Sequence, residues 1–154
     1  MRIVRSQSSG VVSRILATGV PIVYDPMHVG VGAYARFDPV TNTVILGSEA
    51  FSAQTTSPNE FASMIGHELV HARQYVEGRI YLNPNSPGNL MNEYEAWHWE
   101  LEHAAENRLS TAELNEVRAR LTDYYNALPP EDRALADQGI YTIPGAPTFA
   151  TPVP

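Results

Sequence analysis

The sequence predicts an α+β fold in which a small N-terminal sheet precedes a set of helices. Short apolar runs separated by turn residues occupy much of the first fifty positions, as expected of strands. Later segments instead carry apolar residues at helical spacing, and two of them begin with a capping box. With 154 residues, 44% of them hydrophobic, the chain is expected to form one domain over residues 1–154.

Three strands are expected before the first long helix. Residues 21–24 form an apolar run, and residues 33–37 and 43–46 flank the turn-rich segment 38–42. Two strand-like runs joined by such a turn predict a β-hairpin. A short helix is expected over residues 11–18. The hairpin lies just before the first long helix in the sequence, so we expect the sheet to pack on that helix.

The first long helix is expected from Ser57 to about Gly78. Ser57 and Glu60 form a capping box, and Pro58 occupies the first helical position, which proline favours. Apolar residues then recur at helical spacing: Phe61, Ile65, Leu69, Ala72 and Val76. Gly78 is a typical C-terminal stop signal.

The middle of this helix carries the pentapeptide HELVH at residues 67–71. Positions i and i+4 share one face of a helix, so the imidazoles of His67 and His71 can reach one metal ion. Neutral imidazole is a good zinc ligand, and the Glu68 carboxylate can accept a proton from water that the metal polarises. The alternative is a surface helix with two solvated histidines, and the helix signals around the pentapeptide favour the metal site.

Two further helices are expected after a loop rich in turn residues. The second covers about residues 89–108, with an apolar stripe of Leu90, Tyr94, Trp97, Leu101 and Ala104 or Ala105. The third begins with a capping box at residues 110–113 and ends before Pro129-Pro130. Residues 129–154 are expected to form a Pro-rich C-terminal tail with one helical turn near 132–136.

A catalytic zinc ion usually has three protein ligands, so the second helix should supply one more. Its candidates are Glu93, Glu95, His98 and Glu100. At 100° per residue, Glu93 falls about 70° from the centre of the apolar stripe and Glu95 about 130° away. Glu93 is therefore the predicted ligand, and Glu95 is expected to face solvent.

The HELVH pentapeptide, followed by a helix that bears Asn92-Glu93-x-x-Ala96, resembles the gluzincin metallopeptidases, the thermolysin-like group. The resemblance implies a zincin-like fold, a Zn²⁺ ion held by His67, His71 and Glu93, and Glu68 as the general base of peptide-bond hydrolysis. The compact layout is similar to the minimal zincin domains of bacterial toxins and secreted effectors. This likeness implies a toxin or effector domain with a protein or peptide substrate and an immunity or inhibitor protein as partner.

The chain departs from the family pattern at Trp97, where the family has an aspartate four residues after the glutamate ligand. That aspartate normally accepts a hydrogen bond from a liganding histidine. Here Glu100 or a backbone carbonyl is expected to take its place. The sequence leaves the residue that stabilises the oxyanion open among several candidates: His98, His103, Tyr124, Tyr125 and Arg73.

A second interpretation is a non-catalytic zinc-binding module that regulates or binds another protein. Glu68 argues against it, because a purely structural site needs no base beside the metal. In the peptidase interpretation, the strand at 33–37 or at 43–46 is expected to bind substrate by adding a strand to the sheet. A purely structural hairpin is the alternative for this segment.

The composition of the chain argues against some classes of binding partner and some cellular locations. The formal net charge of −7, with no basic patch to neutralise phosphates, argues against nucleic-acid binding. The absence of cysteine excludes disulfides, thiolate zinc sites and a cysteine nucleophile. No apolar run predicts a membrane span, and the N-terminus is a poor signal peptide. The protein is expected to be cytoplasmic, exported by a non-Sec route, or part of a longer chain.

Overall fold

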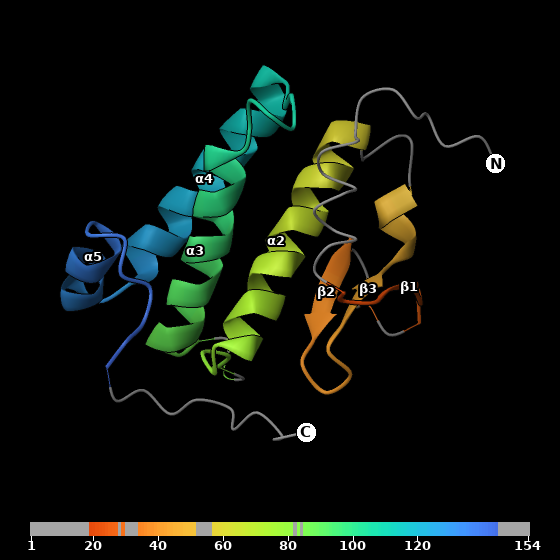
Figure 1. Ribbon diagram of the computed structural model, residues 1–154. Helices are drawn as coiled ribbons and strands as arrows, with labels where there is room; N and C mark the ends of the chain where they lie inside the picture. The colour runs from red at the N-terminus through yellow and green to blue at the C-terminus, as the bar shows by residue number, and fades with distance from the viewer. Residues whose placement is uncertain are drawn as a thin grey trace.

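The structure, a computed structural model, describes residues 19–27, 29, 34–51, 57–81, 83 and 85–144. Over these residues it has a three-stranded sheet, one 3-10 helix and four α-helices (Figure 1). The predicted α+β class is confirmed. The helix expected at 11–18 lies outside the described residues. No helix in the described part of the chain is both long and apolar enough to cross a membrane.

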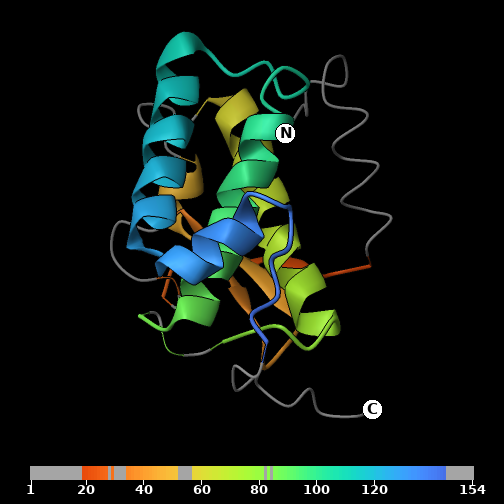
Figure 2. The same ribbon diagram turned by 90° about the vertical axis from the view of Figure 1, so that its left-hand side faces the viewer.

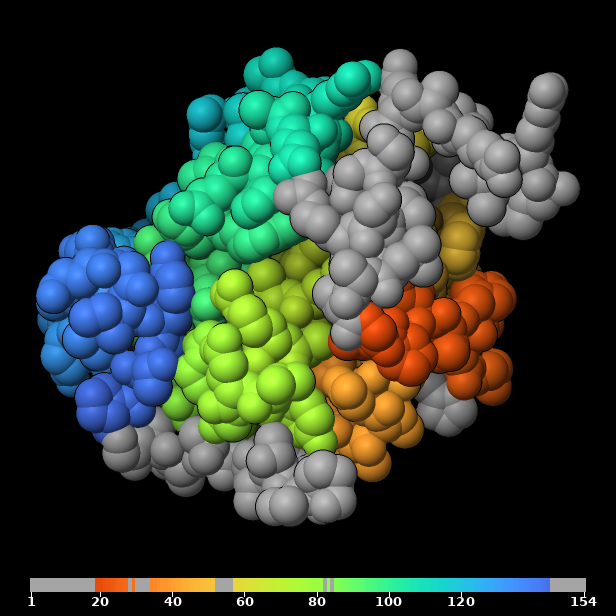
Figure 3. All heavy atoms as spheres, viewed as in Figure 1, coloured from red at the N-terminus to blue at the C-terminus, as the bar shows by residue number. Residues whose placement is uncertain are grey.

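The four helices are α2 (Pro58–Val76), α3 (Pro87–Glu102), α4 (Thr111–Ala127) and α5 (Pro130–Ala136). The sheet packs on one side of α2, and α3 packs on the other (Figures 1 and 2). Helices α4 and α5 both contact α3, and α4 runs back along it. Figure 3 shows the same order across one face, from the sheet through α2 to the C-terminal segment. Helix α2 is therefore the central element of the fold.

The sheet consists of β1 (Ile22–Tyr24), β2 (Ala35–Asp38) and β3 (Thr43–Leu46), in the order β1-β3-β2. Strand β3 pairs in parallel with β1 and antiparallel with β2, and all four of its residues are buried. The predicted hairpin at 38–42 is confirmed. Because β3 is paired on both sides, the expectation that residues 43–46 accept a substrate strand is wrong. Within the described sheet, only the edge strands β1 and β2 could pair with a substrate strand. A 3-10 helix (Ser48–Phe51) follows the hairpin in the chain.

Two apolar clusters lie on either side of α2. The first joins the sheet to α2 through Val44, Leu46, Ala50 and Ile65. The second joins the three C-terminal helices through Met91, Tyr94, Leu128 and Ala136, with Tyr141 and Ile143 packed against it. The first part of the segment predicted as a tail therefore packs against the helices. The face of α2 that carries the pentapeptide lies between the two clusters.

The predicted start and end of α2 are confirmed. The Ser57 hydroxyl accepts a hydrogen bond from the Glu60 backbone N–H, and the Glu60 carboxylate accepts one from the Ser57 backbone N–H. Pro58 occupies the first turn. The helix ends at Val76, and Gly78 adopts a φ of 70°, a left-handed conformation that glycine tolerates.

Helices α2 and α3 approach closely at Gly66, the residue before His67. A Cβ atom there would lie 2.0 Å from the Trp99 ring, so only glycine fits without movement. Helix α3 ends at Glu102, six residues earlier than expected. Residues 103–108 instead form turns, with Arg108 in the left-handed region at φ 55°, because the chain reverses here to enter α4.

Candidate metal centre

Two imidazoles from α2 and one carboxylate from α3 converge between these helices. His67 Nε2 lies 3.6 Å from Glu93 Oε2, and His71 Nε2 lies 3.5 Å from Glu93 Oε1. One ligand atom from each of the three residues lies within 4.8 Å of the other two, which makes a group able to hold a metal ion. The structure thus brings together the three residues that the sequence singled out as ligands.

Glu100 orients the ring of His67. His67 Nδ1 lies 2.8 Å from Glu100 Oε1, and the other carboxylate oxygen accepts a hydrogen bond of 2.7 Å from the Ser63 hydroxyl. Since a carboxylate accepts hydrogen bonds, Nδ1 carries the proton and Nε2 faces Glu93. Of the two alternatives for the missing aspartate, the structure therefore selects Glu100, which is 6% exposed.

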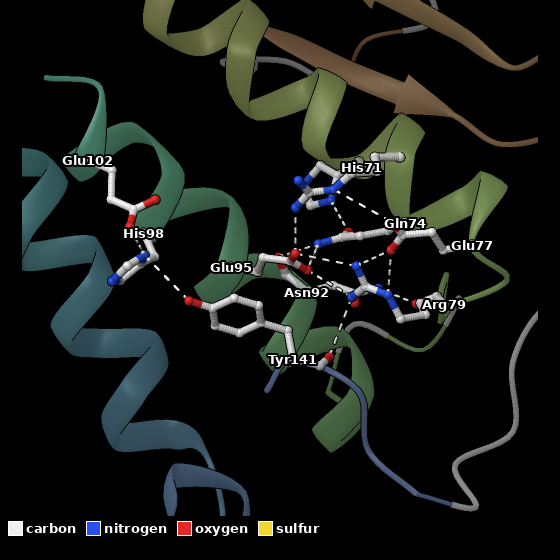
Figure 4. Close-up of polar contacts among 10 residues, drawn as sticks. His71, Gln74, Glu77, Arg79, Asn92, Glu95, His98, Glu102 and Tyr141 are labelled. Carbon is white, nitrogen blue, oxygen red and sulfur yellow. Dashed lines mark hydrogen bonds and ion pairs between the residues drawn. The ribbon is translucent and has the colours of Figure 1, made fainter. Parts of the chain in front are cut away.

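Gln74 orients the ring of His71. Its Nε2 donates to the Asn92 backbone carbonyl at 3.0 Å and to Glu95 Oε2 at 2.8 Å (Figure 4). These two acceptors fix the amide, so its Oε1 accepts the 2.9 Å hydrogen bond from His71 Nδ1. The His71 Nε2 lone pair is therefore free for a metal. Gln74 is not among the residues predicted from the sequence, although its position three residues after His71 on one helix is a signal for this contact.

The expectation that Glu95 faces solvent is wrong. Its side chain is 5% exposed and accepts hydrogen bonds from Arg79 at 2.8 Å and from Gln74 at 2.8 Å (Figure 4). It also accepts one from Arg73 at 2.6 Å. The reason is that α3 has two buried faces, since it packs against both α2 and α4, whereas the apolar stripe in the sequence indicates one. Glu95 is nevertheless separate from the ligand group, which contains Glu93.

The electrostatics of the site favour a bound cation. Burial alone lowers the pKa of His67, but the hydrogen bond to Glu100, the nearby Glu93 carboxylate and the charge of Glu68 raise it to about 10. Burial likewise raises the pKa of Glu93, but its close contacts with His67 and His71 bring it below its usual range. When no metal is bound, the surrounding carboxylates stabilise a proton on His67. The same negative charges would attract a metal cation. Two imidazoles and one carboxylate also fit the usual donor set of a catalytic zinc ion.

Glu68 lies beside this group in a different environment. Its side chain is 8% exposed, and it forms no hydrogen bond with any residue that the structure describes. Together with His67 and Trp97 it lines a pocket of about 330 Å³. The Trp97 ring packs edge-on against His67, with 4.8 Å between ring centroids. The carboxylate next to the ligand group is therefore free to bind a water molecule or substrate.

Among the candidates for stabilising the oxyanion in the described structure, Tyr124 is the one whose pKa is affected by the charge of a residue in the ligand group. Burial raises the pKa of Tyr124, and the negative charge of Glu93 raises it further. The other candidates have partners elsewhere: His98 with Glu102 and Tyr141, His103 with Trp99, Tyr125 with Asp137, and Arg73 with Glu95. The packing of α4 on α3 brings Tyr124 to this position, and the sequence carries no local signal for that contact.

Comparison with protein-family models, with curated proteins and with solved structures finds no match to this chain. The class of the site therefore follows from its own geometry. It is a candidate metal centre formed by two histidines on one helix and a glutamate on the next.

Proposed function

We propose that this protein is a zinc-dependent peptidase with a zincin-like fold and the gluzincin ligand set His67, His71 and Glu93. The observation that carries the proposal is the pairing of this ligand group with Glu68, a buried carboxylate without a hydrogen bond to any described residue, at the wall of a pocket. Zinc is favoured because the donors are two imidazoles and one carboxylate, with no thiolate in the chain.

Each residue then has a defined task in peptide-bond hydrolysis. Zinc, when bound, would polarise the scissile carbonyl and lower the pKa of a water molecule to about 7. The Glu68 carboxylate accepts the proton of the attacking water and delivers it to the leaving amine nitrogen. Glu100 and Gln74 hold the two imidazoles in the correct tautomer. Tyr124 is the candidate donor to the oxyanion, and the edge strand β2 is the candidate for pairing with the substrate backbone.

A non-catalytic zinc-binding module is the second candidate, because the Trp97 ring covers one side of His67. A fourth protein side chain on the metal would favour this module, and an open position would favour the peptidase. The prediction of a toxin or effector role rests on the resemblance in layout alone and stays a prediction.

The test replaces Glu68 by glutamine, which keeps the shape and removes the base. Glu68→Gln should retain zinc at one ion per chain and lose about 10²–10⁴-fold in peptide cleavage. Zinc is measured by elemental analysis, and cleavage by a library of quenched fluorescent peptides. The matched control is Glu102→Gln, at an exposed position on α3, which should leave zinc content and peptide cleavage unchanged. Loss of zinc from Glu68→Gln, or undiminished cleavage, would contradict the proposed role.

A further inference from the structure

The pocket beside Glu68 extends well beyond the metal centre. Its lining follows one face of α2 from Glu68 back to Glu60 near the start of the helix, and α4 forms the facing wall. The eight-residue separation along the helix corresponds to about 12 Å. At about 330 Å³ the pocket is at the small end for ligand sites, so it suits one long side chain better than a large ligand.

Carboxylates gather in the part of the pocket that lies far from the metal along α2. Glu60 on α2 and Glu113 and Glu116 on α4 all line it. Burial raises the pKa of Glu60, and repulsion from Glu113 and Glu116 raises it further. The lining includes one arginine, Arg120, which lies 3.9 Å from Glu116 in an exposed pair. The pocket therefore carries an excess of negative charge.

Each of these carboxylates keeps acceptor capacity for a ligand. Glu60 accepts from the Ser57 backbone N–H, and Glu113 accepts from the Ser57 hydroxyl and the Ser110 backbone N–H. An ionised carboxylate has about four lone-pair sites, so capping uses only some of them. Glu116 takes no part in either capping box.

The same lining also contains apolar side chains: Met64, Trp97, Leu109 and Val117. Such walls suit the methylene stem of a lysine or arginine, whose charged head then reaches the carboxylates. A side chain of this kind matches both parts of the lining.

One buried polar group at the metal end lacks a partner among the described residues, the Trp97 indole N–H. Beside it, the Glu68 side chain is 8% exposed and also forms no hydrogen bond to a described residue. Both residues line the pocket. Buried polar groups are normally satisfied, so a ligand that brings a carbonyl oxygen and a water molecule would complete this end.

We propose that this pocket is the specificity subsite of the peptidase and takes a lysine or arginine side chain next to the scissile bond. The inference rests on the proposed function and adds the substrate class. An acidic side chain would meet like charges here, and a neutral one would form no ion pair with the carboxylates.

The experiment uses peptides that differ only at one position beside the scissile bond, with lysine, arginine, norleucine or glutamate. The zinc-loaded protein should cleave the lysine and arginine peptides with a kcat/KM about tenfold or more above that of norleucine, and glutamate should be the poorest. Glu116→Lys should lower the lysine-to-norleucine ratio about tenfold. The control Glu131→Lys, an equal charge change at an exposed residue of α5 outside the lining, should leave the ratio unchanged.

Binding of the same peptides to the zinc-loaded Glu68→Gln variant, measured by calorimetry, separates the two proposals. If the protein cleaves peptides but prefers norleucine or glutamate, the subsite inference is overturned and the peptidase stands. If no peptide is cleaved, the peptidase fails. The cationic subsite then stands only if the lysine peptide binds more tightly than norleucine and Glu116→Lys removes the difference. Equal binding overturns it.

Discussion

Two hydrogen bonds decide which nitrogen of each histidine faces Glu93. Glu100 holds Nδ1 of His67, and Gln74 holds Nδ1 of His71. The two partners differ in origin, because Glu100 comes from α3 whereas Gln74 lies on the same helix as the histidines. Both rings depend on the packing of α2 against α3: His67 contacts Glu100 of α3 directly, whereas His71 depends on α3 through Gln74, whose amide is fixed by Asn92 and Glu95.

This dependence predicts the effect of Glu100→Gln. A neutral amide is a weaker acceptor than a carboxylate, so the His67 imidazole becomes less basic and less well oriented. Zinc affinity, measured by competition with a chelator, should fall about 10–100-fold while the fold is kept. The exposed Glu102→Gln is the control on the same helix. An unchanged affinity in Glu100→Gln would show that Glu100 does not support the metal centre.

The sequence predicted the histidines and Glu93 as a group for a physical reason. The spacing of i and i+4 fixes two side chains on one face whatever the tertiary structure, and the stripe placed Glu93 at the edge of a buried face. Helical spacing could not predict the burial of Glu95. Its burial depends on Arg79, which belongs to the connection between α2 and α3 and not to any helical pattern.

At the scale of elements, Glu95 connects three parts of the chain. It accepts hydrogen bonds from Arg73 and Gln74 near the end of α2 and from Arg79 in the following connection. Arg79 is itself largely buried and also contacts the Tyr141 carbonyl at 3.5 Å. This network fixes the end of α2 against α3 and the C-terminal segment.

We therefore predict that Glu95→Ala lowers the free energy of unfolding by about 2–4 kcal/mol at pH 7, because it leaves buried donors unpaired. Burial raises the pKa of Glu95, but hydrogen bonds from Arg79 and Gln74 outweigh it and the net pKa is lowered. The contribution is thus fully present above the usual pKa of about 4.3 and is lost as the pH falls through the lowered value. Urea unfolding should be measured between pH 7 and pH 3 for the wild type and for Glu95→Gln. The wild type should have the larger free energy of unfolding at pH 7, and the difference should shrink as the pH falls. An advantage that is constant with pH would contradict this role.

The contact between α2 and α3 gives a second prediction at this scale. Gly66→Ala places a Cβ atom 2.0 Å from the Trp99 ring, so the helices must separate. Alanine is a better helix former than glycine by about 1 kcal/mol, yet overpacking costs about 1–3 kcal/mol. Stability should therefore fall or stay level, and zinc affinity should fall because Glu93 moves away from the histidines. In a Trp99→Ala background the clash is absent, so Gly66→Ala should raise the free energy of unfolding through the better helix propensity of alanine. A gain in stability with full zinc affinity in the single variant would refute the close approach.

The boundaries of the elements show what local sequence can predict. The capping boxes at Ser57 and Ser110 fixed the starts of α2 and α4, because these hydrogen bonds lie within one turn of the chain. The end of α3 could not be read in this way. The periodic pattern continues past Glu102, but the chain must reverse so that α4 can cover α3. The order of the strands was likewise set by pairing between segments distant in sequence.

On the scale of the whole molecule, the candidate centre lies between two apolar clusters. One cluster holds the sheet to α2, and the other holds α4 and α5 to α3. The ligands come from both sides of this division, since the histidines belong to α2 and Glu93 to α3. A bound ion would therefore connect the two halves of the fold and stabilise them together.

Every role proposed above depends on one zinc ion bound by His67, His71 and Glu93. Anomalous diffraction at the zinc edge, on crystals of the protein grown with zinc, locates such an ion. We expect one ion per chain between α2 and α3, with two imidazole Nε2 atoms at about 2.0–2.1 Å and a Glu93 oxygen at about 2.0–2.2 Å. An ion bound instead by Glu95 or Glu100, or no ion between these helices at saturating zinc, would contradict it.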